Sequence, residues 1–318
     1  MSDQCGKSCA SQKSTCGSAQ SAKAMQELAV TRALAKITNK ILVMSGKGGV
    51  GKSTVAVNLA LGLANRGHRV GLMDVDLHGP DVCRMLDLTA PLERGRSGGK
   101  LLPPMQFNDN LKVISLEYLM SDRDEAVIWR GPLKVQAIRQ FIADIDWGDL
   151  DYLVVDAPPG TGDEPLSVAQ IIKDVKALIV TTPQEVALAD VRKSINFCRQ
   201  VEIKVVGLVE NMSGFLCPHC RESVEIFKTG GGEKTARDFD LPFLGRVPMD
   251  PRVVIGGDDG KPFLASGADS PATRAFTEVV ANVEKSLPPR RATTPKPIMA
   301  DCGCGCGNKE AKKSGCEC

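Results

Sequence analysis

The sequence predicts an α/β fold in which a mostly parallel, doubly wound sheet forms a single domain. Short apolar runs alternate with stretches of helical periodicity between residues 37 and 287, and several of these runs end at acidic or Gly-rich residues. The chain has 318 residues, of which 42% are hydrophobic, which is ample for one large core. Because open α/β sheets bind ligands beyond the carboxyl ends of their strands, we expect the functional residues there.

The elements follow from these patterns in chain order. Apolar runs bounded by turn residues predict buried strands, whereas apolar residues at helical spacing, such as Val55, Leu59 and Leu63, predict helices. Residues 89–104 are rich in Gly, Pro and charge, so we expect a loop. The expected strands cover residues 41–44, 69–73, 150–155, 177–180 and 205–209, and the expected helices cover residues 53–64 and 185–199.

Two polar arms flank the predicted domain, which we place at residues 37–287. Residues 1–36 form a Ser- and Gly-rich segment, and residues 288–318 form a Pro-rich linker with a Gly-spaced tail. Both are too polar and Gly-rich to pack, so we expect flexible arms. The tail thiols either trap a soft metal or an iron–sulfur cluster or remain unligated. The arm cysteines are Cys5, Cys9, Cys16, Cys302, Cys304, Cys306, Cys316 and Cys318.

Composition argues against several partners. The chain carries 40 Lys and Arg against 38 Asp and Glu and has only 4% aromatic residues, so we expect no nucleic-acid partner. We find neither an apolar run of membrane-spanning length nor a signal-peptide pattern, so we expect a cytoplasmic protein without a membrane partner. In that reducing compartment, the 12 cysteines indicate metal or redox chemistry rather than disulfides.

One Gly-rich segment satisfies the P-loop pattern for binding ATP, with an apolar strand before it and a helix after it. Its glycines let backbone N–H groups turn toward phosphate oxygens, and the helix N-terminus adds its dipole. Lys52 would contact the β- and γ-phosphates, and Ser53 would bind Mg²⁺. The alternative is a Gly-rich turn that matches by chance. The predicted nucleotide-binding segment comprises Gly46, Lys47, Gly48, Gly49, Val50, Gly51, Lys52, Ser53 and Thr54.

A second lysine, Lys47, stands near the start of this loop. With it, the P-loop resembles that of the deviant-Walker group of dimeric ATPases, which includes MinD, ParA and the nitrogenase iron protein. The resemblance implies that Lys47 reaches across a homodimer to the other subunit's nucleotide, as an arginine finger does. The alternative is a solvated loop charge. The resemblance also makes Asn211 the adenine-contacting residue, with a turn-forming asparagine as the alternative.

The same resemblance assigns roles to the carboxylates that follow two other strands. Residues 156–163 are similar to the switch II segment of the group, which makes Asp156 the carboxylate of the Mg²⁺ shell. Residues 74–80 are similar to its switch I segment, where Asp76 would orient the attacking water and Asp74 would be structural. The expected catalytic residues are Lys47, Lys52 and Asp76.

A pair of cysteines, Cys217-Pro218-His219-Cys220, is the second informative motif. At this spacing both sulfurs can bind one metal, but one pair supplies only half of a four-thiolate site. A two-fold symmetric homodimer completes the site, because each subunit then donates its pair. Four thiolates suit a [4Fe–4S] cluster or Zn²⁺. Cys83 and Cys198 lie in helical stretches, and we expect them to be ordinary buried thiols.

With this pair the resemblance narrows to the Mrp/ApbC/NBP family of ATP-dependent iron–sulfur carriers, and it covers nearly all of residues 37–287. The family implies a labile cluster held between subunits by Cys217 and Cys220 and passed to apo iron–sulfur proteins, with ATP turnover altering the dimer geometry. Whether that cargo is [4Fe–4S] or [2Fe–2S] stays open. Further matching segments are Trp129-Arg130-Gly131-Pro132, Asn211-Met212-Ser213 and residues 245–250.

Other functions remain as alternatives. The cysteine pair could bind a structural zinc at the dimer interface or act as a redox dithiol. A MinD- or ParA-like positioning ATPase usually needs an amphipathic C-terminal helix or a basic surface, whereas this chain ends in a Gly- and Cys-rich tail. A nitrogenase-like electron donor resembles the chain less well, because its cluster cysteines are widely separated.

Overall fold

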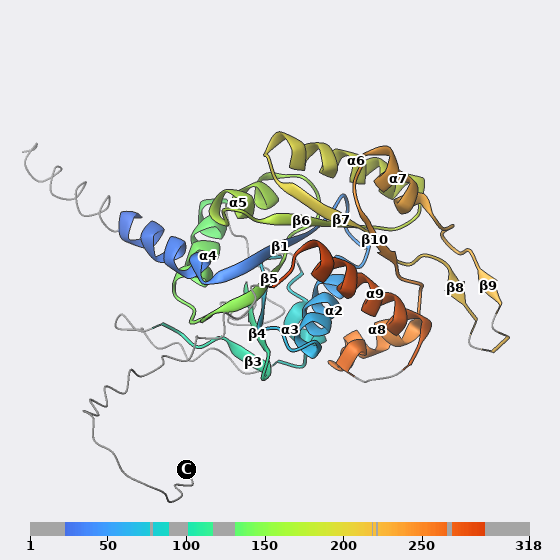
Figure 1. Cartoon of the computed structure of the whole chain (residues 1–318), viewed down its shortest axis with the longest axis horizontal. Coiled ribbons are helices and arrows are strands. Elements are labelled where there is room, and N and C mark those ends of the chain that lie inside the picture. Colours follow the sequence, from blue (N-terminus) through green and yellow to red (C-terminus); the bar gives the residue numbers. More distant parts are fainter. Residues whose placement is uncertain are drawn as a thin grey trace, which may run out of the picture.

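The central element of the computed structural model is an eight-stranded sheet with the strand order β10-β7-β6-β1-β5-β2-β4-β3 (Figure 1). All neighbouring strands pair in parallel except β3, which is antiparallel to β4 at one edge. The predicted mostly parallel α/β fold is therefore confirmed. The strands are β1 (Ile37–Ser45), β2 (Val70–Asp74), β3 (Met105–Asn108), β4 (Leu111–Ser115), β5 (Leu150–Asp156), β6 (Lys176–Thr181), β7 (Lys204–Glu210) and β10 (Phe243–Arg246).

The structure describes residues 23–76, 79–88, 101–116, 131–217, 219–220, 222–265 and 269–289. The arm cysteines, the Trp129-Arg130 pair, most of the predicted loop at 89–104 and two switch I residues lie outside these ranges. Within them, no helix is both long and apolar enough to span a bilayer.

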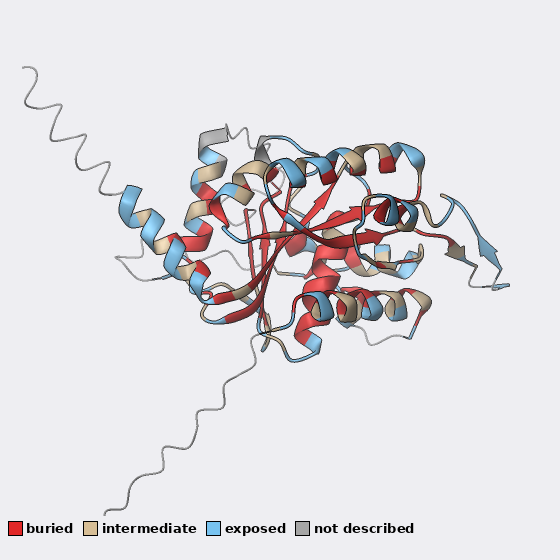
Figure 2. Cartoon of the chain, turned by 45° about the horizontal axis from the view of Figure 1, so that its top comes forward, coloured by how far each residue is buried: buried red, intermediate tan, exposed pale blue. Residues whose placement is uncertain are grey.

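Helices cover both faces of the sheet, and each face has its own hydrophobic core. Alternation along β1 explains this, because Ile41 and Val43 pack toward α2 and α9, whereas Leu42 and Met44 pack toward α5 and α6. Strands buried on both faces are mainly apolar, and Figure 2 shows the central strands buried along most of their length. The helices are α2 (Lys52–Asn65), α3 (Val82–Met85), α8 (Pro251–Asp258) and α9 (Pro271–Ser286) on one face, and α4 (Gly131–Ala143), α5 (Asp163–Ile171), α6 (Glu185–Gln200) and α7 (Gly231–Asp238) on the other.

The packed domain begins earlier than the sequence suggests. We expect residues 1–36 to be a flexible arm, but residues 23–35 form a helix. Val30 and Leu34 lie on one side of that helix and are buried in the core that also contains α4 and α5. The stretch is rich in Ala and also contains Leu, Lys, Arg, Gln, Glu and Met, which are strong helix formers, so its composition could have indicated this element.

The described chain ends close to the start of β1. Ser270 caps α9 by accepting a hydrogen bond from the backbone N–H of Thr273 at 3.0 Å. At the other end of that helix, the Leu287 carbonyl accepts from the Tyr152 hydroxyl at 2.7 Å, and the Pro288 carbonyl accepts from Asn39 at 3.0 Å. The Pro-rich linker therefore leaves the domain at the amino ends of the strands.

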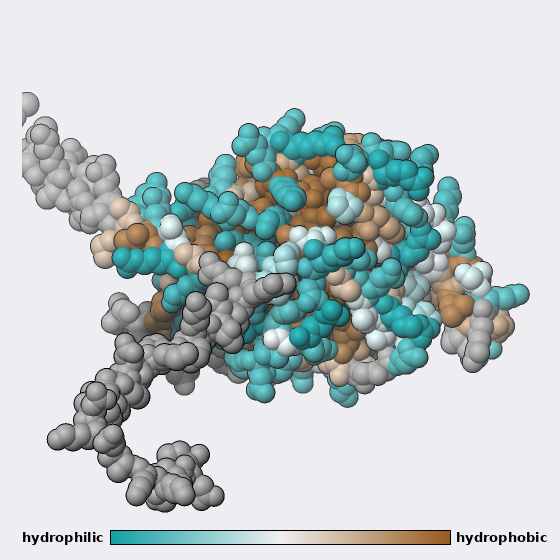
Figure 3. Space-filling model, in the orientation of Figure 1, coloured by the Kyte–Doolittle hydropathy of each residue, from teal (hydrophilic) through white to brown (hydrophobic). Residues whose placement is uncertain are grey.

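A small two-stranded sheet projects beyond the edge of the main sheet near β7 and β10 (Figure 1). It pairs β8 (Phe215–Leu216) with β9 (Ser223–Val224), and we call the segment from Gly214 to Thr229 the cysteine hairpin. None of its described residues belongs to either hydrophobic core. Its side chains Leu216, Val224 and Ile226 are exposed, and Figure 3 shows apolar atoms gathered at this end of the molecule.

Candidate functional site

The predicted P-loop connects β1 to α2 at the carboxyl edge of the sheet. Gly49 and Gly51 have φ angles of 78° and 80°, a left-handed conformation that glycine adopts without strain. Gly51 is also the N-cap of α2 and supplies no side-chain cap, so the first N–H groups of the helix are available to an anion. The loop faces a cavity of about 330 Å³, lined by Ser45, Lys47, Gly48, Gly49, Gly51, Lys52, Ser53, Thr54, Asp76, Gly79, Asp81, Met85 and Pro159.

Three members of the predicted nucleotide-binding set are not among the described residues that line this cavity. Gly46 lies against α6, where a Cβ atom would come within 2.5 Å of the carbonyl carbon of Asp190. Val50 is buried in the core, and its carbonyl accepts a hydrogen bond from Asn211 Nδ2 at 2.9 Å. In this structure Asn211 therefore stabilises the backbone of the P-loop at Val50. Its contact with adenine stays a prediction.

Lys52 lies between two carboxylates at the floor of the cavity. Its Nζ atom is 2.6 Å from Asp156 Oδ1 and 3.5 Å from Asp76 Oδ2, and all three side chains are buried. Burial disfavours the charged ammonium, but Asp156, and then Asp76 and Asp74, outweigh it and raise the pKa of Lys52. The structure thus brings together the phosphate lysine and the two acidic strand ends that the sequence predicts.

Asp74 has a supporting role, as we expect. It is fully buried, and its Oδ1 accepts from the backbone N–H of Asp76 while its Oδ2 accepts from the Ser115 hydroxyl, both at 3.0 Å. Burial, together with the charge of Asp156, raises the pKa of Asp74 well above its ordinary value. These bonds hold the backbone that carries Asp76 toward the P-loop.

The cavity residues fit Mg²⁺ and a polyphosphate. Asp156 Oδ2 is buried without a hydrogen-bond partner among the described residues, and burial raises the pKa of this carboxyl. Oxygen ligands are what Mg²⁺ prefers, and the Ser53 hydroxyl lies in the same cavity. Ser53 and Asp156 therefore fit the ligand chemistry of Mg²⁺, and a cation beside Asp156 would satisfy the unpartnered oxygen.

Lys47 also lines the cavity. It is half-buried, and within the described part of the chain its ammonium makes no ion pair. Its backbone carbonyl accepts from the Ser45 hydroxyl at 2.9 Å, so the loop backbone is fixed while the side chain is not. This is the arrangement expected of a cation that acts on a ligand rather than on its own chain.

The cysteine hairpin carries the two predicted metal ligands away from the core. Cys217 is half-buried and Cys220 is exposed, as is His219. Backbone N–H groups of Cys220 and then His219 lower the pKa of Cys217, which favours its thiolate. Burial instead raises the pKa of Cys198 to about 11. Cys83 and Cys198 are buried, so their predicted role as core thiols is confirmed.

One hairpin does not complete a metal site. Among the described residues, no group of three or more His, Cys, Asp or Glu side chains is arranged to hold a metal ion. The Cys220 thiol has Glu222 within 3.8 Å, but that contact is exposed. A tetrahedral site needs about four ligands, so the described residues of one subunit do not complete it.

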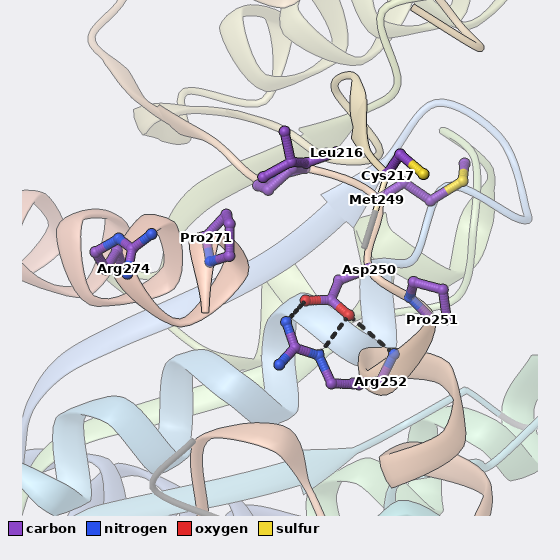
Figure 4. Close-up of a pocket in the computed structure, with 9 residues that line it drawn as sticks. Leu216, Cys217, Met249, Asp250, Pro251, Arg252, Pro271 and Arg274 are labelled. Carbon is purple, nitrogen blue, oxygen red and sulfur yellow. Dashed lines mark hydrogen bonds and ion pairs between the residues drawn. The ribbon is translucent and has the colours of Figure 1, made fainter. Parts of the chain in front are cut away.

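A second cavity, of about 600 Å³, opens beside Cys217 (Figure 4). Figure 4 shows Cys217 and Met249 next to each other above the Asp250 and Arg252 pair. Asp250 caps α8 and accepts from the Arg252 guanidinium at 2.8 and 3.0 Å. Sequence reasoning missed this cavity, because its lining comes from three segments that meet only in the folded chain: Leu216 and Cys217, Pro248 to Arg252, and Pro271 with Arg274.

Sequence reasoning also missed Glu210, a fully buried glutamate at the end of β7. Its Oε1 accepts from the Ser213 hydroxyl at 2.5 Å and from the Gly230 N–H at 2.8 Å, and its Oε2 accepts from the Gly232 N–H. The available signal is the run of three glycines at 230–232 just before a helix, since such a run permits close approach to an anion.

The fold and this site define a P-loop nucleotide-binding protein. The family described as ParA, the NUBPL iron-transfer P-loop NTPases, matches residues 36–284, and the chain belongs to it.

Solved structures agree with this assignment. The nucleotide-binding protein of Archaeoglobus fulgidus in complex with ADP, in which cobalt was found, is 35% identical, with a TM-score of 0.66 over 79% of this chain and 96% of that one. The cell division ATPase MinD of Pyrococcus furiosus is 24% identical, with a TM-score of 0.59 over 78% and 99% of the two chains. MinD of Pyrococcus horikoshii with Mg-ADP is 22% identical, with a TM-score of 0.58 over 78% and 96%. The MinD likenesses show the shared fold.

Proposed function

We propose that this protein is an ATP-dependent iron–sulfur cluster carrier. It binds a labile [4Fe–4S] cluster between two subunits and passes it to apo iron–sulfur proteins. The observation that carries this proposal is the incomplete ligand pair, because Cys217 and Cys220 lie on a projecting hairpin with no further ligands arranged around them in the described residues.

A cargo site and a structural site place different demands on a cysteine pair. A structural metal is closed off by its ligands and contributes to folding, whereas a transferable cluster must stay accessible to a recipient. The cysteine hairpin is exposed and adds nothing to either core, so the fold does not depend on what it binds. This supports a cargo role over a structural zinc.

A homodimer is the simplest source of the missing ligands. Two copies of the hairpin related by a two-fold axis supply four thiolates, which suit an iron–sulfur cluster. A dimer interface at this point would bury apolar surface, because the side chains beside the pair are apolar and exposed: Leu216, Val224 and Ile226. Lys47 lines the nucleotide cavity and makes no ion pair with any described residue, and this independently favours a second subunit there.

The nucleotide site of this proposal is the cavity around Lys52. A bound polyphosphate would compete with Asp156 and Asp76 for the Lys52 ammonium, while Asp156 and Ser53 would take a magnesium ion. Mg²⁺ supplies charge neutralisation of the phosphates. Asp76 would hold the attacking water, and Lys47 of the opposite subunit would stabilise the developing charge.

Cluster content tests the proposal. Full-length protein is reconstituted anaerobically with iron and sulfide, and visible absorption, iron and sulfide are measured against subunit number by sedimentation. A bridging [4Fe–4S] cluster corresponds to about two iron atoms per subunit at the hairpin. Cys217→Ser and Cys220→Ser should each lose this amount relative to wild type, while Mg-ATP affinity by calorimetry stays unchanged.

The matched control is Cys83→Ala, which removes a buried thiol of α3 and should keep the full iron content. The difference between wild type and the hairpin variants also corrects for any iron on the arm cysteines. Full iron content in Cys217→Ser, or a stable cluster on a monomer, contradicts the bridging site. One zinc per dimer without iron uptake favours the structural-zinc alternative.

A further inference from the structure

Two consecutive residues at the end of β7 lie against different functional elements. Side chains of successive strand residues point to opposite faces of a sheet, so Glu210 and Asn211 project in opposite directions. Both are buried, with exposures of 0% and 6%. Packing alone does not explain either position, because the polar atoms of each side chain form hydrogen bonds with a specific loop.

The Glu210 carboxylate accepts hydrogen bonds from both ends of the cysteine hairpin. Ser213, which precedes the hairpin, donates its hydroxyl to Oε1 at 2.5 Å, and Gly230, which follows it, donates its N–H to the same atom at 2.8 Å. Gly232 donates to Oε2 from the first turn of α7. A carboxylate at a helix N-terminus is favoured by the helix dipole, so these contacts reinforce one another.

The contact between Glu210 and the backbone that follows the hairpin leaves little room for a Cβ atom at Gly232. Gly230 has a φ of 81°, and a Cβ atom at Gly232 would come within 3.0 Å of Glu210 Oε2 and 3.1 Å of Thr181. The backbone after the hairpin therefore approaches Glu210 as closely as glycine allows. A small displacement at the end of β7 must move both ends of the hairpin.

Asn211 joins the same strand end to the P-loop. Its Nδ2 donates to the Val50 carbonyl at 2.9 Å, and its backbone N–H donates to Thr181 at 2.7 Å. Val50 stands between the two left-handed glycines, Gly49 and Gly51, and both of these line the phosphate cavity. A ligand that fixes the P-loop therefore also fixes Asn211, and Glu210 is its covalent neighbour.

We propose that Glu210 is a positioning residue that couples the P-loop to the cysteine hairpin, so that nucleotide binding sets the accessibility of Cys217 and Cys220. The coupling runs from the Val50 carbonyl through Asn211 and Glu210 to Ser213, Gly230 and Gly232. The role of this coupling rests on the proposed function, because it lets nucleotide binding act on the two cysteines that would hold the cluster.

The test measures thiol reactivity, with no metal present. Full-length protein is treated with N-ethylmaleimide with and without a magnesium-bound, non-hydrolysable ATP analogue, and the rates at Cys217 and Cys220 are read by peptide mass spectrometry. We expect nucleotide to slow modification of Cys217 by about fivefold, the lower end of typical coupling between sites. Rates are compared between samples that sedimentation shows to be in the same association state.

Glu210→Gln should bring the ratio of the Cys217 modification rates, without and with nucleotide, close to one. The reason is that the NH₂ group of the amide would face the backbone N–H of either Gly230 or Gly232, which is also a donor. Its Mg-nucleotide affinity by calorimetry should stay within about twofold of wild type. The matched control is Glu225→Gln, which changes an exposed hairpin glutamate that accepts a hydrogen bond from Thr229 and should keep the full ratio. Ser213→Ala removes one of the three bonds and should give an intermediate ratio.

Backbone hydrogen bonds from Ser213 to Val247 and from Met249 to Gly214 stay in place in these variants, so the hairpin remains attached. A wild-type ratio near one, or a full ratio in Glu210→Gln, overturns the proposal, as does an equal loss in Glu225→Gln. If Glu210→Gln fails to fold, an unchanged ratio in Ser213→Ala overturns it. Failure of the iron–sulfur function alone leaves the ratio intact, because the assay contains no cluster.

Discussion

At the scale of single residues, the nucleotide cavity is organised by one buried cation between carboxylates. Lys52 neutralises Asp156 and Asp76, and Asp74 holds the backbone beside them. Such a cluster is costly to bury unless its charges balance, so Lys52 serves folding as well as phosphate binding.

Lys52→Ala should abolish measurable Mg-ATP binding by calorimetry, because it removes the charge that faces the β- and γ-phosphates. It should also lower the free energy of unfolding by about 3 kcal/mol at neutral pH, since it leaves Asp156 buried without its partner. The folded-state pKa of Asp156 lies above its unfolded value, so the folded variant takes up a proton first as pH falls. The stability deficit should therefore shrink toward acid pH in denaturant titrations.

The control for this change is Lys193→Ala, which removes an exposed lysine paired with Asp190 at 2.9 Å. That pair should contribute less than about 1 kcal/mol. Wild-type affinity for Mg-ATP in Lys52→Ala would contradict the assignment of the P-loop.

At the scale of elements, the P-loop depends on its contact with the end of β7. Gly51 combines a left-handed backbone with close packing, because a Cβ atom there would collide with Asn211 Nδ2. The loop glycines are thus not equivalent, which agrees with the P-loop pattern, because that pattern requires glycine at positions 46 and 51 but not at 48 and 49.

Gly51→Ala should lower the free energy of unfolding by roughly 2 kcal/mol, because it combines backbone strain with loss of the Asn211 contact. Gly48→Ala is the matched change, since no atom lies within 4 Å of its added Cβ and its φ is not left-handed. We expect that variant to stay within about 0.5 kcal/mol of wild type. Equal destabilisation of the two variants in urea titrations would show that packing against Asn211 is unimportant.

The main strands and the nucleotide cluster were accessible to sequence reasoning for a physical reason. Strands buried on both faces are continuous apolar runs, and β5 and β7 extend the predicted 150–155 and 205–209 by only one residue at an end. Lys52, Asp76 and Asp156 follow strands whose carboxyl ends meet at one edge. Glu210 could not be found this way, because its partners at 213 and 230–232 become neighbours only when the hairpin folds back.

At the scale of the whole molecule, both proposed chemistries call for a second copy of the chain. Among the described residues the cysteine pair has no further ligands, and Lys47 lines its own nucleotide cavity without an ion pair. Membership in the iron-transfer P-loop NTPase family agrees with such a division of work between nucleotide and metal.

Lys47→Ala should leave Mg-ATP binding largely intact but slow hydrolysis by roughly 10³-fold, the lower end for an arginine finger. Mixing it with Asp76→Ala protein should restore activity, because one site of each heterodimer then has both groups. Random mixing gives about a quarter of the wild-type number of intact sites. If differently tagged subunits form heterodimers and phosphate release does not recover, Lys47 does not act across subunits.

The cysteine hairpin has one further consequence, which concerns how such proteins diversify. Among the described residues it shares no side chain with either core, and both of its ends meet at Glu210. A segment joined in this way can vary in length and sequence without changing the packing of either core, provided that its ends keep their bonds to Glu210. One nucleotide-binding domain of this family can therefore present different binding loops, because the variation is confined to the 16 residues from Gly214 to Thr229.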